Sequence, residues 1–455
     1  MKSKQLLLIV LILAALIAAW MVVLGSDKSE EQAALQAELV EKADVFAGKE
    51  LYVRAIPLYS EALSYSTDQN DAIYERLLDC YLSSGDNDSF VSLVESRVSK
   101  KKADADTCLK AAEILVSYDD FKEAETLLID AYDYLDGEEA EKIREYYETF
   151  RYSYNMRVTD FDAIITCANQ SILPARNGTK YCYISPSGYD LFKATYDSVT
   201  RFNNNGVAVV KNDGKYYAIN TDGVKYSIDE TGVEAVSDLT DNYIIAQKEE
   251  KYGFYDIDFN PVAEDLKFDR IIVGGVGNWA VQSGKKWAFL DPSGTDLTGP
   301  KFEDVAQNSE CNAFVYMTVT KDGKSVTSPV AVAKESGRWY LVDETGAHIT
   351  EKSFDCAAAP ESDGYIAVLG ENGKWGFINT DGELVIDYKF HSAESFSDNL
   401  AAVRVDENGK WGYINRAGDV VIEAKFDWAA PFKNGMAIAG YNGKTAILEL
   451  ELYSE

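Results

Sequence analysis

Few residues in this chain have the type and spacing that catalysis or metal binding requires. Only two of the 455 residues are histidines, His348 and His391, and we expect both to be structural or surface residues. The sequence DIDFN at residues 256–260 begins like a calcium-binding loop, but Pro261 stands where the turn glycine should be and Lys267 where the bidentate glutamate should be. No nucleophile elbow, phosphate-binding loop, zinc-protease helix or dinucleotide fingerprint occurs in the sequence. We therefore predict no catalytic residue, no metal site and no cofactor, and we expect a protein that is not an enzyme.

The composition limits the class of protein. The chain has 75 acidic and 44 basic residues, a formal net charge of -31, and 46% of its residues are hydrophobic. This composition is typical of a folded chain, whose 455 residues suggest roughly three domains. Nucleic-acid-binding proteins normally have a basic stripe that neutralises phosphates, so the negative net charge of this chain argues against nucleic-acid binding.

The six cysteines have neither C-x-x-C nor zinc-ligand spacing, and we expect them to be small buried hydrophobic residues. In an oxidising compartment Cys167 and Cys182 would be the closest pair in sequence for a disulfide, so the sequence leaves the disulfide state open. The six are Cys80, Cys108, Cys167, Cys182, Cys311 and Cys356.

An apolar segment near the N-terminus predicts a membrane anchor. Residues 6–24 form an unbroken apolar run of 19 residues, which as a helix would span roughly 28 Å, close to the hydrocarbon thickness of a bilayer. The run is long for a cleaved signal peptide and ends in Val-Val-Leu, which favours an uncleaved signal-anchor over a cleaved signal. Lys2 and Lys4 precede it, so the positive-inside rule places the body of the protein outside the cytoplasm. We expect residues 1–25 to be the transmembrane helix of a single-pass protein of the cell membrane.

Residues 26–157 have the periodicity of a helical repeat domain. Apolar and small residues recur at helical spacing, and the landmarks Phe46, Tyr81 and Leu115 are 35 and 34 residues apart. A last helix over residues 138–156 would end the array. The alternative is an ordinary helical bundle with accidental spacing.

This helical pattern resembles the tetratricopeptide repeat, whose period is 34 residues, although the Trp and most of the Gly and Pro positions of that family are missing here. The resemblance implies a concave groove that binds a protein or peptide. No residue of the segment indicates such binding by itself.

From residue 158 to residue 455 one unit of about 36 residues is repeated. NGKWGFINTDGELVID, from Asn372, returns as NGKWGYINRAGDVVIE, from Asn408. A second landmark, usually Phe-Asp, also recurs once in each unit, and an insertion near residues 312–328 interrupts the period. The aromatic residue of the motif recurs with spacings of 35, 36, 35, 52, 36 and 36, at Tyr181, Tyr216, Tyr252, Trp287, Trp339, Trp375 and Trp411.

Each unit can be divided into short strands. In the last complete copy a strand leads to Asn408 and Gly409, a dipeptide suited to a tight hairpin. Residues 410–415 then alternate, so that Trp411 and Tyr413 share one face of the next strand. A further turn and a third strand follow, so the unit is a β-meander of three or four strands.

These motifs resemble the WG repeat family of bacterial proteins, and the resemblance covers most of residues 161–455. Tyr replaces Trp in the first three copies and the Gly after Trp287 and Trp339 is missing, which leaves seven or eight units. The resemblance implies a β-rich repeat fold without an assigned enzymatic activity. The structural signature consists of the seven aromatic residues given above together with Gly373, Gly376, Gly409 and Gly412.

Two architectures fit the β repeats. The units could close into a β-propeller or stack as an open β-solenoid. The repeats begin partway through a unit and the last unit keeps only its first two strands, which favours a ring that is closed by joining first and last repeats. The third strand that such a closure needs is not evident in the sequence. The predicted fold class is thus a multidomain chain with a transmembrane helix (residues 1–25), a tetratricopeptide-like helical domain (26–157) and an all-β repeat domain (158–455).

The aromatic column has a structural and a functional interpretation. Carbohydrate binding would expose it as a stacking surface, whereas a repeat architecture would bury it between units, because one unit cannot bury its apolar face alone. We favour the structural interpretation.

Three classes of function remain. We expect a membrane-anchored, extracytoplasmic binding or scaffolding protein that uses its repeat domains to bind a protein or peptide partner. A cell-wall or carbohydrate-binding protein is the alternative, and an enzyme with a site in a propeller channel is the least supported by the sequence.

Overall fold

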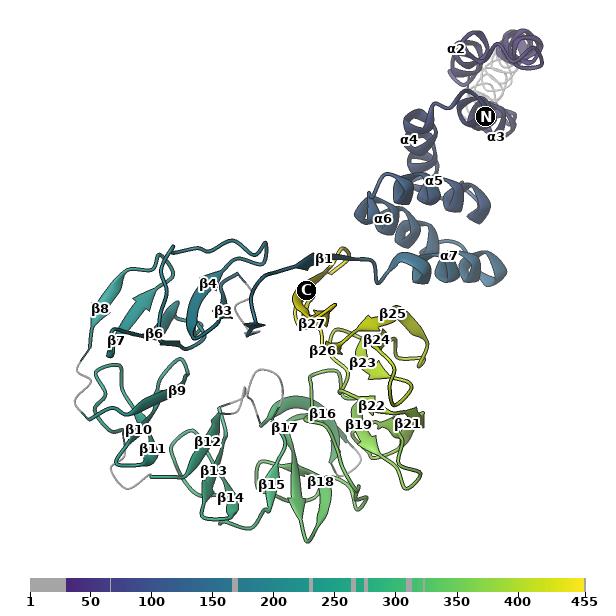
Figure 1. Cartoon of the computed structure of the whole chain (residues 1–455). Helices are drawn as coiled ribbons and strands as arrows, with labels where there is room; N and C mark the ends of the chain where they lie inside the picture. Colours follow the sequence, from purple (N-terminus) through teal and green to yellow (C-terminus); the bar gives the residue numbers. More distant parts are fainter. Residues whose placement is uncertain are drawn as a thin grey trace, which may run out of the picture. The chain divides into compact units, whose positions relative to one another are not determined.

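The chain divides into two compact units, Met1–Arg151 and Tyr152–Glu455, the first helical and the second built from small sheets (Figure 1). The sequence places the change between the two domains later, after residue 157. A computed structural model describes residues 30–65, 67–165, 171–228, 232–262, 267–273, 277–307, 313–321 and 324–453.

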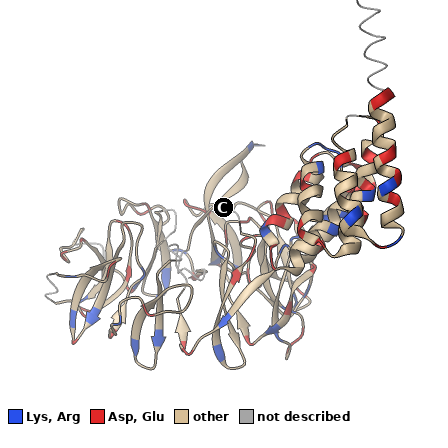
Figure 2. Cartoon of the chain, turned by 90° about the horizontal axis from the view of Figure 1, so that it is seen from above, with Lys and Arg blue, Asp and Glu red and all other residues tan. Residues whose placement is uncertain are grey.

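In the described part of the first unit, each helix packs against the next one along the chain. Small buried residues such as Ala43, Ala55 and Ala62 lie where the first helices meet. Acidic residues are spread along the helices (Figure 2), and most of them are exposed, so the negative charge is on solvated faces. The helices are residues 30–47, α2 (Tyr52–Ala62), α3 (Asn70–Ser84), α4 (Asn87–Val98), α5 (Ala105–Ser117), α6 (Phe121–Tyr132) and α7 (Gly137–Phe150).

The spacing of Phe46, Tyr81 and Leu115 corresponds to one position near the ends of three helices. The backbone carbonyl of each accepts a hydrogen bond, at 2.9 Å, from the N–H five residues later. Such a bond closes a helix C-terminus when a left-handed residue precedes the donor. The residues that precede the three donors are Glu50, Gly85 and Asp119, and their φ values are 57°, 75° and 61°. The period therefore marks a repeated helix end.

No helix in the described residues is long and apolar enough to cross a membrane. The longest of α2–α7 has 15 residues, about 23 Å, and carries charged side chains, whereas a membrane span needs about 20 apolar residues. This finding contradicts the transmembrane element of the predicted fold class and the predicted single-pass location in the cell membrane. The apolar run on which both predictions rested, residues 6–24, lies outside the described residues.

The described part of the second unit contains eight antiparallel sheets, and none of them closes on itself. They follow one another around a ring (Figure 1), which is how blades are arranged in a β-propeller. The first four sheets are β2 (Ala163–Ile164), β3 (Leu173–Asn177) and β4 (Lys180–Ile184); β5 (Ser198–Val199), β6 (Val207–Asn212), β7 (Lys215–Asn220) and β8 (Lys225–Ser227); β9 (Ala235–Leu239), β10 (Ile244–Lys248) and β11 (Lys251–Tyr255); and β12 (Arg270–Val273), β13 (Trp279–Ser283) and β14 (Lys286–Leu290). The next three are β15 (Asp304–Val305), β16 (Val315–Lys321), β17 (Lys324–Glu335) and β18 (Arg338–Asp343); β19 (Ile366–Leu369), β20 (Trp375–Ile378) and β21 (Leu384–Phe390); and β22 (Ser392–Ala393), β23 (Ala401–Arg404), β24 (Trp411–Ile414) and β25 (Val420–Phe426).

The eighth sheet joins the two ends of the second unit. It contains β26 (Trp428–Ala429), β27 (Met436–Tyr441), β28 (Lys444–Leu450) and, paired with β28, β1 (Tyr154–Val158). β1 is the strand that the sequence of the last unit lacks.

The predicted helix over residues 138–156 is therefore wrong at its C-terminal end. Helix α7 stops at Phe150, and the chain enters β1 four residues later. The partner of β1 lies at the other end of the unit, so no local periodicity could distinguish this strand from one more helical turn.

Apolar side chains on both faces of the sheets form a cluster between each pair of neighbouring sheets. Tyr413 packs between the seventh and eighth sheets, and the next residue, Ile414, between the sixth and seventh. Ile164 of the first sheet packs with Ile438 and Ile447 of the eighth. The ring is thus closed by side-chain packing as well as by β1, whereas an open solenoid would leave these two sheets apart.

The cysteines of the described residues are not paired with one another. Cys80, Cys108 and Cys182 are buried, Cys356 is half-buried, and none of these four forms a disulfide. Cys167 and Cys311 lie outside the described residues.

Candidate functional site

The aromatic column lies on equivalent strands of seven sheets. Six of its seven members pair in the backbone with the second landmark, as Trp287 does with Phe302 and Trp411 with Phe426. Trp287 and Tyr216 are buried, and the other five members are half-buried. The other five are Tyr181, Tyr252, Trp339, Trp375 and Trp411.

Cationic side chains cover several rings of the column. The guanidinium of Arg270 lies 5.3 Å from the ring centroid of Trp287, and that of Arg404 lies 5.9 Å from the ring of Trp411. These are cation–π distances, and the cations occupy ring faces that a sugar would need for stacking. The column therefore contributes to the scaffold, and the binding surface has to be sought elsewhere.

The glycine after the tryptophan lets the neighbouring strand approach closely. A Cβ added at Gly412 would lie 2.6 Å from a backbone oxygen of β25, and one added at Gly376 would lie 2.7 Å from a backbone oxygen of β21. The pairing register shifts at this point in both sheets. In the turn that precedes the motif, Gly373 has a φ of 72°, which favours glycine. Gly409 occupies the same place in the next unit and has no positive φ.

A lysine and an aspartate link successive sheets at their outer turns. Lys180 Nζ of the first sheet lies 2.5 Å from Asp197, which precedes the second sheet. Between the last two sheets, Lys410 contacts Asp427, and this carboxylate also accepts the N–H of Gly443 at 2.8 Å. The N–H of Gly443 and the charge of Lys410 lower the pKa of Asp427. The Lys of the repeat motif is thus part of the scaffold too.

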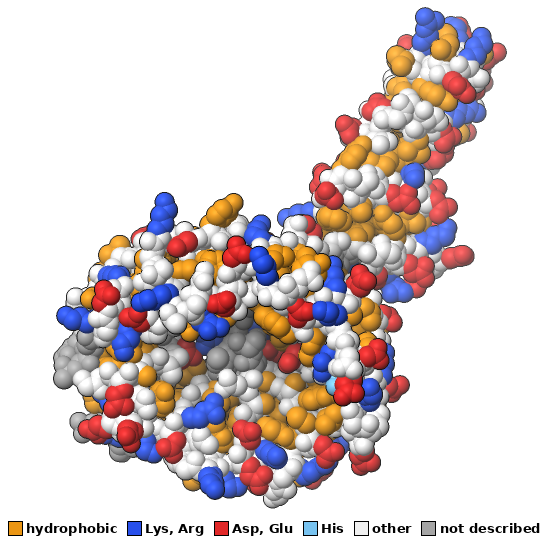
Figure 3. All heavy atoms as spheres, in the orientation of Figure 1, with side chains coloured by type: hydrophobic (Ala, Val, Ile, Leu, Met, Phe, Trp, Pro, Cys, Tyr) orange, Lys and Arg blue, Asp and Glu red, His pale blue; other side chains and the backbone are white. Residues whose placement is uncertain are grey.

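Loops from seven of the eight sheets surround a cavity of about 560 Å³, which we call the loop-face pocket. Figure 3 shows that the ring is hollowed near its centre. Most of these loops connect the first strand of a sheet to the second, so the pocket draws on positions about 36 residues apart; in the sixth sheet the loop precedes β19. Its exposed side chains include Asn204, Asp241, Asn242, Tyr316, Ser362 and Asn434.

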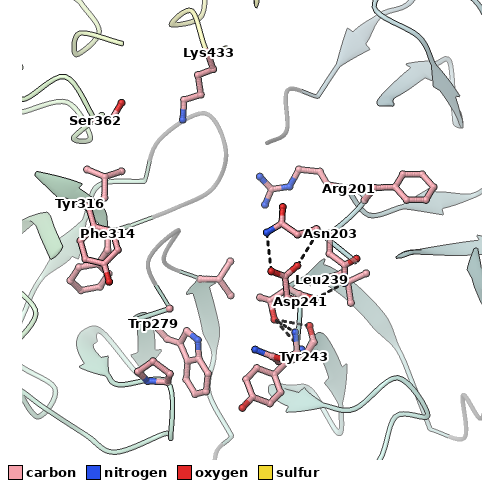
Figure 4. Close-up of a pocket in the computed structure, with 18 of the residues that line it drawn as sticks. Arg201, Asn203, Leu239, Asp241, Tyr243, Trp279, Phe314, Tyr316, Ser362 and Lys433 are labelled. Carbon is pink, nitrogen blue, oxygen red and sulfur yellow. Dashed lines mark hydrogen bonds between the residues drawn. The ribbon is translucent and has the colours of Figure 1, made fainter. Parts of the chain in front are cut away.

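Hydrogen bonds between neighbouring loops hold the walls of the pocket (Figure 4). Asn204 donates its backbone N–H and its side-chain amide to the carboxylate of Asp241, both at 2.8 Å. On another wall, Asp398 accepts the N–H of Gly435 at 2.8 Å. These bonds join different sheets, so the pocket is fixed in place by the ring.

Two ion pairs neutralise charged groups at the pocket. Arg201 Nη2 lies 2.7 Å from Asp238, and Lys433 Nζ lies 2.9 Å from Glu361. The second pair joins the eighth sheet to the sixth and is largely buried, with 11% and 4% of the two side chains exposed. Burial, together with the nearby Glu361, raises the pKa of Glu394 to about 7. The surface offered to a ligand is therefore mainly amide, hydroxyl and aromatic.

These pocket residues are not among those predicted from the sequence, although the sequence contains a signal for two of the loops. Asp398-Asn399 and Asn434-Gly435 occupy equivalent places in successive units, and all four have positive φ values between 49° and 75°. Asn, Asp and Gly tolerate this conformation, so the pair marks a repeated tight turn. At the predicted calcium-like string, the carboxylate of Asp256 accepts the backbone N–H groups of Asp258 and Asn260, at 2.9 and 2.8 Å, which is an ordinary turn.

Comparisons with known proteins bear on the repeats. The family model "WG containing repeat" matches residues 191–216, 375–410 and 411–444. No curated protein matches the chain. Among solved structures, one described as the eukaryotic initiation factor has a TM-score of 0.37 at 11% identity and covers 66% of this chain and 88% of that one. The AfRom2 CNH domain has a TM-score of 0.34 at 9% identity, with coverage of 66% and 100%. Likenesses this distant carry no inference about function, whereas the family matches lie within the ring of sheets described above: the C-terminal part of the chain contains WG repeats.

Proposed function

We propose that this chain is a non-enzymatic binding protein whose ring of sheets holds a protein partner in the loop-face pocket. The observation that carries the proposal is the origin of the pocket: loops from seven sheets contribute to a single concave surface. The sheets beneath these loops are packed on both faces, so the loops can vary without loss of the ring. A WG-repeat domain of this kind supports a repeat-based interaction function.

The chemistry of the pocket fits a peptide segment. Its amide and hydroxyl groups can bond to peptide N–H and C=O groups, and its aromatic residues can contact apolar side chains. Its main charged groups are already paired, which disfavours a highly charged nucleic acid.

A cell-wall glycan is the second candidate, because Tyr316 is 54% exposed and lies beside amide side chains. A glycan is less well supported, because the ring of Trp279, also at the pocket, is stacked on Phe254 at 3.9 Å and has Tyr243 against it edge-on. Its faces are therefore not open for stacking with a sugar.

Photo-crosslinking in the source cells tests the proposal. The photoreactive amino acid p-benzoylphenylalanine would replace Asn434 or Asn242, both exposed at the pocket, or Tyr226, which is 53% exposed on β8 outside it. We expect a discrete protein adduct from the two pocket positions and none from Tyr226. A glycan adduct would favour the second candidate, and equal labelling at all three positions would contradict a binding role for the pocket.

A further inference from the structure

Strand β16 breaks the regularity of the ring. The spacing between Trp287 and Trp339 is 52 residues, against 35 or 36 elsewhere. The additional residues form β16 and the first half of β17, a hairpin that no other described sheet contains. The regular strands of this fifth sheet are present without it, since β15 and β18 both pair with the second half of β17.

The hairpin is fixed against the sixth sheet. Met317 and Val319 are buried, with 2% and 1% exposed, in a cluster that includes Ile366 of β19. The hydroxyl of Thr380 donates to the backbone carbonyl of Thr318 at 2.8 Å. One face of β16 is therefore used for attachment, and the ring would close without it.

The other face of the hairpin contributes to the loop-face pocket. Phe314 at its base is fully buried, and Tyr316 is 54% exposed at the pocket wall (Figure 4). Tyr243 and Trp279 also line the pocket, so the third, fourth and fifth sheets supply most of its aromatic residues; the remaining one, Phe202 of the second sheet, is buried. The sixth, seventh and eighth sheets supply Ser362, Ser397, Asp398 and Asn434, which are polar.

This division matches a ligand that has an apolar side chain on a polar backbone. An exposed tyrosine on a fixed strand offers apolar contact area at a low cost in conformational entropy, which suits it for recognition. The polar part of the pocket has the groups that a peptide backbone needs.

We propose that the β16–β17 hairpin is the specificity element of the loop-face pocket, and that it selects peptides with an aromatic or long aliphatic side chain, which packs on Tyr316. The inference rests on the proposed function of the same pocket. It adds the chemical class of the peptide and the residue that contacts its apolar side chain.

Selection of phage-displayed random dodecapeptides on the full chain tests the inference, with the affinities of the selected peptides measured by fluorescence polarisation. We expect the selected peptides to share an aromatic or long aliphatic residue. Tyr316→Ala should weaken their binding about tenfold or more, the scale of loss when an aromatic anchor is truncated. Tyr316→Phe should retain binding within about threefold, because the apolar ring is kept. Tyr226→Ala, which removes an equally exposed tyrosine outside the pocket, should leave it unchanged.

The outcomes separate the two proposals. The selected peptides could bind the Tyr316→Ala variant as tightly as the unaltered chain and yet fail to bind the Asn434→Arg variant. That result would overturn the role of the hairpin and leave peptide binding at the pocket in place. Failure to select any peptide would overturn both. Because Tyr316 is exposed, its alanine variant should melt at the temperature of the unaltered chain, and a lower melting temperature would instead assign the residue to the scaffold.

Discussion

Closure of the ring by β1 can be tested with a pair of proline substitutions. Two backbone hydrogen bonds flank the pairing of β1 with β28: Glu451 N–H donates to Ser153 O at 2.9 Å, and Thr159 N–H donates to Thr445 O at 2.8 Å. Bonded and non-bonded residue pairs alternate in antiparallel sheets. The N–H of Arg157, two residues before Thr159, therefore faces β28, whereas the N–H of the next residue faces away.

Arg157→Pro should destabilise the ring much more than Val158→Pro. Proline at 157 removes a donor to β28 and leaves a carbonyl of that strand unpaired, which together cost about 2–4 kcal/mol in the free energy of unfolding. Val158 is 43% exposed on what is the edge strand of the sheet, where proline is tolerated, so its substitution should cost less than about 1 kcal/mol. Arg157→Ala is the control for the side-chain hydrogen bond from Arg157 to Pro186 O, at 2.9 Å.

Urea unfolding of the full chain, followed by tryptophan fluorescence, provides the assay. Six of the seven tryptophans lie between residues 279 and 428, and residues 30–151 contain none, so the signal reports the ring. Circular dichroism at 222 nm follows the helices in the same samples. Equal effects of the two prolines, or no effect of either, would refute the assignment of β1 as the closing strand.

The same pairing predicts where the chain can be divided. A fragment of residues 152–455 keeps β1 and should fold. A fragment of residues 158–455 keeps only Val158 of this strand and loses backbone hydrogen bonds that contribute about 5 kcal/mol, which approaches the whole stability of a typical domain. The boundary after residue 157 that the sequence suggests would therefore yield a poorly folded ring.

Three further predictions concern the scaffold. Gly412→Ala should lower the free energy of unfolding by about 1–3 kcal/mol, because its Cβ would meet backbone 2.6 Å away, whereas Gly409→Ala, with 3.3 Å to its nearest neighbour, should cost less in the same urea titration. Because the folded-state pKa of Glu394 is raised from 4.5 to about 7, the ring should lose up to about 3 kcal/mol of stability as the pH rises from 4.5 through 7, and Glu394→Gln should remove that slope. The pKa of Asp427 is lowered, so its stabilisation is present above about pH 4 and lost as the pH falls further. Asp427→Asn should reduce the pH dependence of the free energy of unfolding between pH 5 and pH 2.5. An unchanged pH dependence would contradict the link that Asp427 makes between the sheets.

The strands of the regular units could be predicted closely from the sequence. Residues 410–415 are predicted as a strand, and β24 covers 411–414. Trp411 and Tyr413 were expected on one face, and both pack in the cluster between the seventh and eighth sheets. This success has a physical cause: strand alternation, the Asn-Gly turn and the close approach at the glycine are all local, so one unit contains the information for its own sheet.

Closure and the pocket could not be predicted because both depend on contacts between distant units. β1 follows a helix directly and takes its register from β28, at the other end of the unit. The pocket residues come from successive loops. The repeated turns at Asp398-Asn399 and Asn434-Gly435 mark two of these loops in the sequence, but they do not show that the loops meet around one cavity. Trp287 and Trp411 illustrate the limit in another way, since the period shows that they occupy a repeated position but not that an arginine side chain covers a face of each ring.

Regularity and function are separated in this chain. Positions that the repeat keeps constant, such as Trp411, Gly412 and Asp427, pair strands, pack between sheets or link neighbouring turns. Positions at which the units differ lie in the loops around the pocket, and the largest departure from the period, the β16–β17 hairpin, supplies the exposed Tyr316. A ring whose stability resides in its constant positions can accept changes in these loops at low cost. The irregular residues are therefore where the binding specificity of this chain should be sought, and the tryptophan column is where its stability should be.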